Sequence, residues 1–214
     1  MNFEILKTWT IPYPGCEPSQ IRQKEFNIVR LKDGNLAFCK VDTAPEYLAH
    51  EAEILSGLND LDCVPLLIYQ TPTAIFTTYI KGKLLPEIMD SLGVAECIKV
   101  GWQILAIVAR VHKKGVIHSD IRSWNFIYGD DTHLYIIDFE YAYFKYQQSE
   151  VDSLLRVHHG ENLKTPFLDW IDAWKCIVNV WQISTHRIIK NVLVYIPISI
   201  HWGMRRIMRL LRKF

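Results

Sequence analysis

Apolar residues gather in short runs over the first 80 positions, and turn residues separate these runs. Several of the runs are β-branched or aromatic, and Lys-Asp-Gly-Asn at residues 32–35 is a strong hairpin signal between two of them. The pattern is typical of a strand-rich half. It predicts five strands, at residues 3–10, 25–31, 36–41, 64–68 and 74–80.

Helical spacing begins after the second hairpin strand. Residues 46–58 carry apolar residues on one helical face. Residues 94–114 are apolar around much of the circumference and are followed by Gly115, a common helix stop, so we expect a buried central helix. Residues 165–214 are also expected to be mainly helical, with a break or kink at Pro197.

Length and cysteine content restrict the class of protein. With 214 residues, half of them hydrophobic, the chain can bury a core as one domain or as two small lobes. Its five cysteines are widely separated, and neither a Cys-x-x-Cys pair nor a secretory signal is present. We therefore expect a reduced, cytoplasmic chain without a disulfide framework or a zinc knuckle.

Charge divides the chain into an acidic body and a basic tail. No Asp or Glu follows Asp172, and residues 173–214 contain eight Lys or Arg. Residues 204–214 place apolar residues on one helical stripe, with arginines around it. This stripe either lies on an anionic membrane surface, at the inner face of the membrane, or packs on the domain. The apolar run at residues 192–202 is too short to span a bilayer. No nucleic-acid partner is expected, because the basic stretch is single and terminal.

The polar residues that suggest chemistry begin in the loop at residues 118–125, His-Ser-Asp-Ile-Arg-Ser-Trp-Asn. Two strand-like runs follow, joined by the turn Gly-Asp-Asp-Thr, so we expect a hairpin that brings Asn125 and Asp138 to the same end. Oxygen ligands at that end would suit magnesium. The alternative is a polar turn in which Asp120 caps a local N–H and Asp138 ends a strand.

The order His-x-Asp, four residues, Asn, then a hairpin and Asp-Phe, resembles the catalytic and metal-binding loops of the protein-kinase-like superfamily. This resemblance implies a kinase with ATP and Mg²⁺ as cofactors. Asp120 would then orient the acceptor hydroxyl and take its proton, while Asn125 and Asp138 would hold magnesium against the ATP phosphates. Arg122 would lie near the transferred phosphoryl group.

Residues upstream fit the same resemblance. Lys40, in Leu-Ala-Phe-Cys-Lys-Val, resembles the strand lysine that reaches the ATP phosphates, and Glu51 resembles the helix glutamate that pairs with it and orients it. Residues 77–85 resemble a hinge at which Tyr79 would contact the adenine edge. The alternatives are that Lys40 is a solvated lysine at the edge of the sheet, and that residues 77–85 are a plain strand followed by a turn. The segment that would cover the phosphates lacks Gly-x-Gly-x-x-Gly and offers Gly15 alone.

The resemblance covers residues 25–155 and departs from conventional protein kinases. Glu140 follows Asp138-Phe139 at the position where protein kinases have glycine. A glutamate at this position is similar to choline, ethanolamine and antibiotic kinases. The following segment is too short for a long activation segment, and Asp152 resembles the aspartate that braces the catalytic loop in compact members. These features favour the compact branches, RIO-like protein kinases and lipopolysaccharide sugar kinases of the Kdo and heptose type.

The resemblance therefore implies an α+β, two-lobed protein-kinase-like fold with a strand-rich N-lobe and a short helical C-lobe. We expect the nucleotide-covering N-lobe at residues 1–82 and the C-lobe with the catalytic and metal loops at residues 83–172. A basic, apolar helical tail would occupy residues 173–214.

Three functional hypotheses follow. The first is ATP-dependent transfer of the γ-phosphate to a hydroxyl of a membrane-associated glycan, such as a lipopolysaccharide core sugar, which the compact C-lobe and the basic tail favour. The second is a compact RIO-like Ser/Thr protein kinase, which Arg122 and the lead-in to the catalytic loop favour. The third is a pseudokinase that acts as a binding module, which the missing glycine-rich loop favours.

Overall fold

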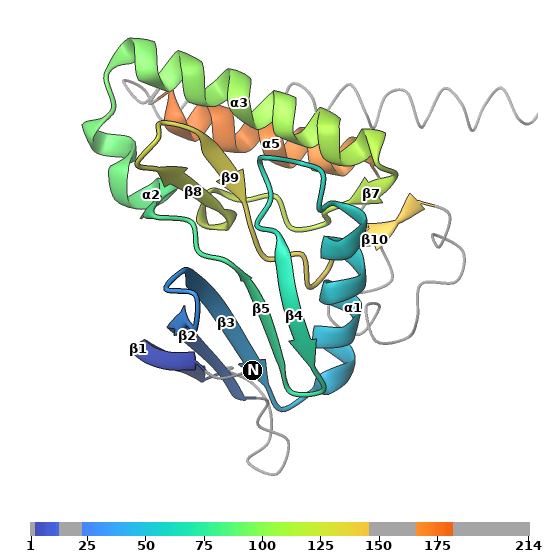
Figure 1. Ribbon diagram of the computed structural model, residues 1–214. Helices are drawn as coiled ribbons and strands as arrows, with labels where there is room; N and C mark the ends of the chain where they lie inside the picture. The colour runs from blue at the N-terminus through green and yellow to red at the C-terminus, as the bar shows by residue number, and fades with distance from the viewer. Residues whose placement is uncertain (1–2, 13–22, 146–165, 182–214) are drawn as a thin grey trace, which may run out of the picture.

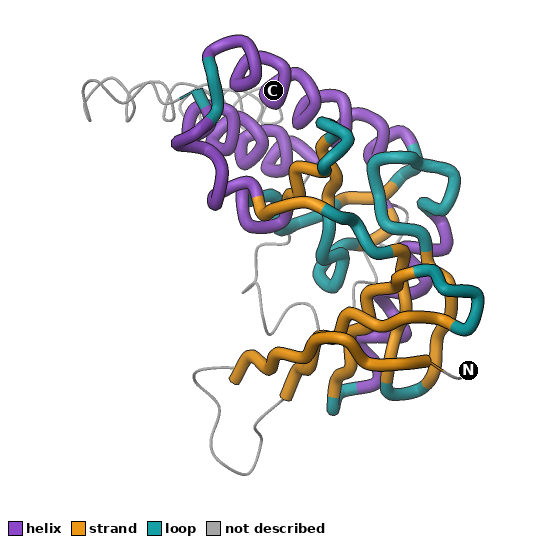
Figure 2. Tube along the Cα trace, turned by 60° about the vertical axis from the view of Figure 1, so that its left-hand side comes forward, coloured by secondary structure: helices purple, strands orange, loops and turns teal. Residues whose placement is uncertain are grey.

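The computed structural model describes residues 3–12, 23–145 and 166–181 and places them in two lobes (Figure 1). One lobe is built on a five-stranded antiparallel sheet, and the other combines helices with two small sheets. Most helices gather at one end of the molecule and the long strands at the other (Figure 2). The expected α+β, two-lobed architecture is therefore confirmed. The four cysteines among the described residues are buried and free.

The large sheet has the strand order β1-β2-β3-β5-β4, and every neighbouring pair is antiparallel. Gly34 adopts φ +87° in the turn between β2 and β3, a left-handed conformation that favours glycine. The hairpin expected from its Asp-Gly pair is thus present. The strands are β1 (Phe3–Pro12), β2 (Gln23–Leu31), β3 (Leu36–Asp42), β4 (Leu67–Thr71) and β5 (Ala74–Thr78).

The two faces of this sheet have different neighbours. One face carries a small core that includes Val29 and Phe76. Lys40 and its ladder partner Ile75 point to the opposite face, because side chains alternate along a strand. Ile75 belongs there to the large core that α1 (Pro45–Gly57) shares with the second lobe. Lys40 therefore stands on the central strand facing the second lobe, and it is not a solvated edge lysine.

One strand begins later than the sequence suggested. We expected a strand at residues 64–68, whereas β4 begins at Leu67. Pro65 has no N–H to donate to a ladder, and the N–H of Val64 donates to Leu61 O at 3.4 Å in a turn. The chain therefore reaches the sheet only after this turn.

The second lobe begins after residues 79–81, which connect β5 to β6. A three-stranded sheet has the order β6-β8-β9, and the short strands β7 and β10 pair with each other. Gly115, at φ +77°, follows the end of α3 and acts as the expected stop. The elements are β6 (Gly82–Leu84), α2 (Leu85–Ile88), α3 (Val94–Lys113), β7 (Val116–Ile117), β8 (Phe126–Gly129), β9 (Leu134–Ile136), β10 (Tyr143–Phe144) and α5 (Pro166–Val180), with 3₁₀ turns at Met89–Ser91 and Ser123–Asn125.

The helices α3 and α5 lie side by side in both views (Figures 1 and 2). A glycine at position 101 permits their close approach, because a Cβ there would lie 2.7 Å from Nε1 of Trp181. The same Nε1–H donates to Cys97 O at 2.9 Å. This contact fixes α5 against the central helix and so fixes the position of the side chains that α5 presents to the rest of the lobe.

The change of charge after Asp172 does not mark a change of structure. Helix α5 runs without a break through residue 173, and Cys176 and Ile177 belong to the large core. The amphipathic stripe at residues 204–214 lies outside the described residues. Within the described part of the chain, no helix combines the length and the apolar character that crossing a bilayer requires.

Candidate active site

The hairpin of β8 and β9 brings the two expected metal ligands together. Phe126 pairs with Ile136, and the N–H of Ile137 donates to Asn125 O at 3.0 Å. Asn125 therefore lies beside the residue that precedes Asp138, although thirteen positions separate the two in sequence. The turn expected from Gly-Asp-Asp-Thr closes the hairpin at its other end.

Asp120 is the centre of the loop that leads into this hairpin. Nδ2 of Asn125 donates to both Asp120 O (2.8 Å) and Asp120 Oδ2 (2.9 Å). Arg122, whose side chain is largely exposed, places Nη2 2.8 Å from the same Oδ2. Because the amide nitrogen of Asn125 serves Asp120, its Oδ1 is the atom left to act as a ligand.

Asp138 has a backbone conformation that is uncommon for a residue with a side chain. Its φ is +64°, a region in which aspartate is enriched relative to most residues. Its carboxylate is one third exposed, and Oδ1 lies 3.2 Å from Nζ of Lys40. Burial is the largest single effect and raises its pKa, but the charges of Lys40 and Lys24, together with the hydrogen bond from Lys40, hold the pKa of Asp138 below its usual range.

Lys40 and Glu51 form the ion pair that the sequence led us to expect. Nζ of Lys40 lies 2.7 Å from Oε2 of Glu51 on α1, and both side chains are almost fully buried. Burial would lower the pKa of Lys40, but three neighbouring carboxylates raise it well above its usual value, so the amine stays charged. The pKa of Glu51 is raised, chiefly by burial, against the attraction of Lys40.

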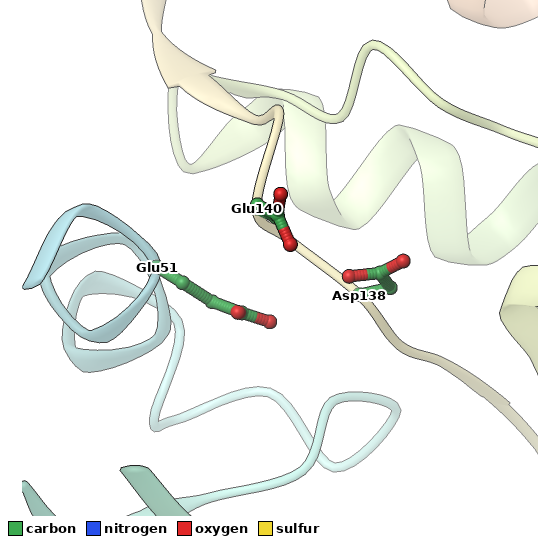
Figure 3. Close-up of side chains that lie close together, drawn as sticks. All are labelled: Glu51, Asp138 and Glu140. Atoms are coloured by element: carbon green, nitrogen blue, oxygen red, sulfur yellow. The ribbon is translucent and has the colours of Figure 1, made fainter. Parts of the chain in front are cut away.

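Three carboxylates, from Glu51, Asp138 and Glu140, point toward one another (Figure 3). Such a group can hold a cation, but the ammonium of Lys40 already lies within 3.2 Å of an oxygen of each. We therefore interpret the group as the counter-charge of Lys40. The oxygen ligands open to a metal are then those of Asp138 and Asn125.

Two further charged residues, whose roles were not predicted from the sequence, join this group. Lys24 of β2 places Nζ 2.5 Å from Oε2 of Glu140, which has no exposed surface. The two residues are 116 positions apart. Glu140 was noted only as a substitute for glycine, and no motif marked Lys24.

Asp169 of α5 is a third residue whose role was not predicted from the sequence. Its carboxylate has no exposed surface and accepts the N–H groups of His118 (2.8 Å) and Ser119 (3.0 Å). Nε2 of His112 lies 3.0 Å from its Oδ2. The brace for the loop was expected from Asp152, which lies outside the described residues. An acidic residue among apolar neighbours in an amphipathic helix was the available signal.

His118 braces the loop as a neutral side chain. Its Nε2 is 3.1 Å from Ile137 O, its Nδ1 is 3.3 Å from the N–H of Asp120, and its ring packs on Phe139. One nitrogen thus donates and the other accepts, which only the neutral ring can do. Burial, against the nearby carboxylates, lowers the pKa of His118 and favours this form.

The sheet face that carries Lys40 also carries an aromatic surface. Phe26 is opposite Lys40 in the ladder, and Phe38 precedes Lys40 by two positions, so both rings share its face. Their centroids are 5.9 Å apart, and Trp9 lies 6.1 Å from Phe26. Tyr79 is half-buried in the connection between the lobes.

Comparison with known proteins assigns these features to a family. A family model described as the RIO domain matches residues 21–156. A probable bifunctional tRNA threonylcarbamoyladenosine biosynthesis protein of Methanocaldococcus jannaschii is 27% identical over 146 residues, which are 63% of this chain and 26% of that protein. The KEOPS complex subunit Bud32 of Pyrococcus abyssi is 28% identical over 102 residues, 46% of each chain. The chain thus spans about a quarter and about half of the lengths of these relatives.

A solved structure agrees on the fold. The kinase PK-1 of the Cydia pomonella granulovirus superposes with a TM-score of 0.64 at 15% identity, covering 92% of this chain and 77% of that one. The expected membership of the protein-kinase-like superfamily is confirmed, whereas likeness to lipopolysaccharide sugar kinases and to choline kinases stays a prediction. Because the matched model covers well over half of its length, the chain belongs to the RIO domain family.

Proposed function

We propose that this chain is an ATP- and magnesium-dependent phosphotransferase that moves the γ-phosphate to a hydroxyl group, with a protein side chain as the acceptor. The observation that carries the proposal is the meeting of Lys40 and Asp138 across the two lobes, 3.2 Å apart. Asp120 and Asn125 lie at the same end of the adjoining hairpin. We call these four residues and Glu51 the interlobe site.

Magnesium fits the ligands of the interlobe site. Asp138 offers a charged, partly exposed carboxylate, and Asn125 offers its amide oxygen, which are the hard oxygen donors that magnesium prefers. When bound, the ion would neutralise phosphate charge as the γ-phosphoryl group is transferred. The lowered pKa of Asp138 keeps its carboxylate ionised and ready to bind a cation.

The remaining roles follow from position. Lys40, held by Glu51, would bind phosphate oxygens through an amine that stays charged. Asp120 would orient the acceptor hydroxyl and take its proton, and Arg122 would stabilise the transferred phosphoryl group. Because the transition state of phosphoryl transfer is loose, positioning and charge neutralisation are the main contributions that these side chains make.

The aromatic face beside Lys40 suits the base of a nucleotide, while Tyr79 would contact the adenine edge. We expect Phe38→Ala to weaken ATP binding about 5- to 150-fold, the usual range for losing one base-stacking ring. Binding of inorganic tripolyphosphate, which has no base, should not change. Isothermal titration calorimetry measures both. Phe3→Ala, on the opposite face beside Phe76, is the matched control, and equal losses for both ligands would contradict the assignment.

Family membership favours a protein acceptor over a glycan. The RIO domain match agrees with the second hypothesis, and none of the proteins compared above is a glycan kinase by name. The lipopolysaccharide hypothesis also relied on the stripe at residues 204–214, which lies outside the described residues. We therefore place the RIO-like protein kinase first.

A second candidate is a subunit role in a larger assembly. One relative carries the name of a KEOPS complex subunit and another that of a tRNA threonylcarbamoyladenosine biosynthesis protein. This favours a protein partner, and the chain would then serve as a kinase-fold subunit of a tRNA-modifying assembly. A pseudokinase that binds nucleotide without turnover would be compatible with such a role.

Transfer of label from [γ-³²P]ATP tests the proposal. The purified chain is incubated with magnesium and labelled ATP in a lysate of its own cells, and the protein and glycolipid fractions are counted. We expect label in the protein fraction. Label in the glycolipid fraction would restore the glycan hypothesis. Tight ATP binding without label in either fraction would identify a binding module.

A further inference from the structure

A second lysine stands beside Lys40 on the same face of the sheet. Lys24 lies on β2, two positions before Phe26, which is opposite Lys40 in the antiparallel ladder. Because side chains alternate along a strand, all three residues face the second lobe. Lys24 is 8% exposed, so most of its side chain is removed from bulk water.

Lys24 reaches the other lobe at the segment that follows Asp138. Its Nζ lies 2.5 Å from Oε2 of Glu140, and Nζ of Lys40 lies 3.0 Å from the same oxygen. Glu140 points into the space that the carboxylates of Glu51 and Asp138 also face (Figure 3). Two ammonium groups therefore converge on the interlobe site, from two neighbouring strands.

Stabilisation of the fold is a weak reason for such a pair. The cost of removing two charges from water often equals or exceeds their attraction, so buried ion pairs contribute little net stability. The pair also lies where chemistry is expected, because Lys24 and Lys40 share one oxygen of Glu140, and Nζ of Lys40 lies 3.2 Å from Oδ1 of Asp138. Its position therefore points to a ligand.

A polyphosphate chain is the ligand that a second lysine would serve. A nucleoside triphosphate brings several negative charges between the lobes, and in many kinases a glycine-rich loop before the second strand covers them. Here Gly15 is the single glycine in residues 11–22, which precede β2. Lys24 is the second residue of β2, and Gln23 alone separates it from that segment.

We propose that Lys24 is a second phosphate-binding lysine, which Glu140 holds in position and which takes the place of a glycine-rich loop. The inference rests on the proposed function and adds a residue to it. The ligand class is a nucleoside diphosphate or triphosphate, bound through its phosphate chain.

Three ligands separate this role from a structural one. ATP, inorganic tripolyphosphate and AMP, each with magnesium, are titrated calorimetrically into the wild-type chain, Lys24→Gln and Lys24→Arg. Glutamine still donates to Glu140 but has no charge. We expect Lys24→Gln to bind ATP and tripolyphosphate about 10- to 150-fold more weakly, the range for one charge-assisted hydrogen bond. AMP binding should not change, and arginine should restore affinity for the longer phosphate chains.

Lys32→Met, in the exposed turn between β2 and β3, is the matched control and should bind all three ligands like the wild type. If circular dichroism shows that Lys24→Gln does not fold, the double variant Lys24→Met with Glu140→Gln is used in its place. Its binding of ATP, tripolyphosphate and AMP is then compared with that of the wild type in the same way. If tripolyphosphate bound equally well with and without Lys24, the role of Lys24 would be overturned while the proposed function would stand. Equal losses of affinity for AMP and for ATP in Lys24→Gln would have the same consequence. A wild-type chain that binds neither ATP nor tripolyphosphate would overturn the proposed function and this inference with it.

Discussion

Replacing Asp138 with asparagine should abolish the magnesium-dependent stabilisation that ATP gives to the wild-type protein. A ligand that binds only the folded state at a concentration of about 100 Kd adds about 2.7 kcal/mol to the free energy of unfolding. For a chain of this size, that corresponds to a rise in Tm of roughly 5–10 °C. Asparagine keeps the size of the side chain but removes the negative charge, so that the two proposed ligands, Asn125 and residue 138, would both be neutral.

The fold should survive this change. Lys40 retains Glu51 at 2.7 Å and Glu140 at 3.0 Å, so its ammonium does not become an unpaired buried charge. We therefore expect the Tm of the ligand-free variant to remain close to that of the wild type. Phosphate transfer should fall at least about a hundredfold, because the metal would supply several kcal/mol of charge stabilisation in the transition state.

The measurement is thermal unfolding with ATP, with and without magnesium, followed by a turnover assay. Asp130→Asn, an exposed aspartate in the turn of the same hairpin that pairs with Lys81, is the control and should keep the full shift. A magnesium-dependent shift that persists in Asp138→Asn would place the metal elsewhere. A wild-type protein without any shift at millimolar nucleotide would remove the basis for the proposed function.

The parts of the site that are local in sequence could be predicted. Asp120 and Asn125 are five positions apart in one loop, and the turn residues of the following hairpin identify the end at which Asp138 emerges. Lys40 and Glu51 lie eleven positions apart on a strand and the helix that follows it. Strand alternation, helical period and turn chemistry act over such distances, so each placement has a signal in the sequence.

The contacts that join distant segments could not be predicted. Lys24 meets Glu140 across 116 positions, and Asp169 meets His118 across 51. Neither contact follows from a periodicity, because the first depends on how the two lobes pack and the second on how α5 packs within its own lobe. The sequence also contained a misleading feature. The change of charge after Asp172 coincides with no structural boundary, because α5 continues through it and has buried residues on both sides of it.

Asp169 leads to the prediction with the largest expected effect on stability. Asp169→Ala removes the acceptor of two buried N–H groups, those of His118 and Ser119, which are 1% and 2% exposed as residues. Each unsatisfied buried donor costs about 1–3 kcal/mol. Removing one partner from a buried charged network typically costs about 3–5 kcal/mol. We therefore expect the free energy of unfolding to fall by about 3–5 kcal/mol, measured by urea denaturation.

The same substitution should impair turnover in protein that is still folded, because Asp169 holds the backbone immediately before Asp120. At low temperature, where the variant is native, we expect ATP binding through Lys40 to persist while phosphate transfer falls. Asp62→Ala, which breaks the exposed ion pair with Arg110, is the control and should cost at most about 1 kcal/mol. A loss below about 1 kcal/mol for Asp169→Ala would show that other groups satisfy these two N–H donors, and the brace would have to be sought elsewhere in the chain.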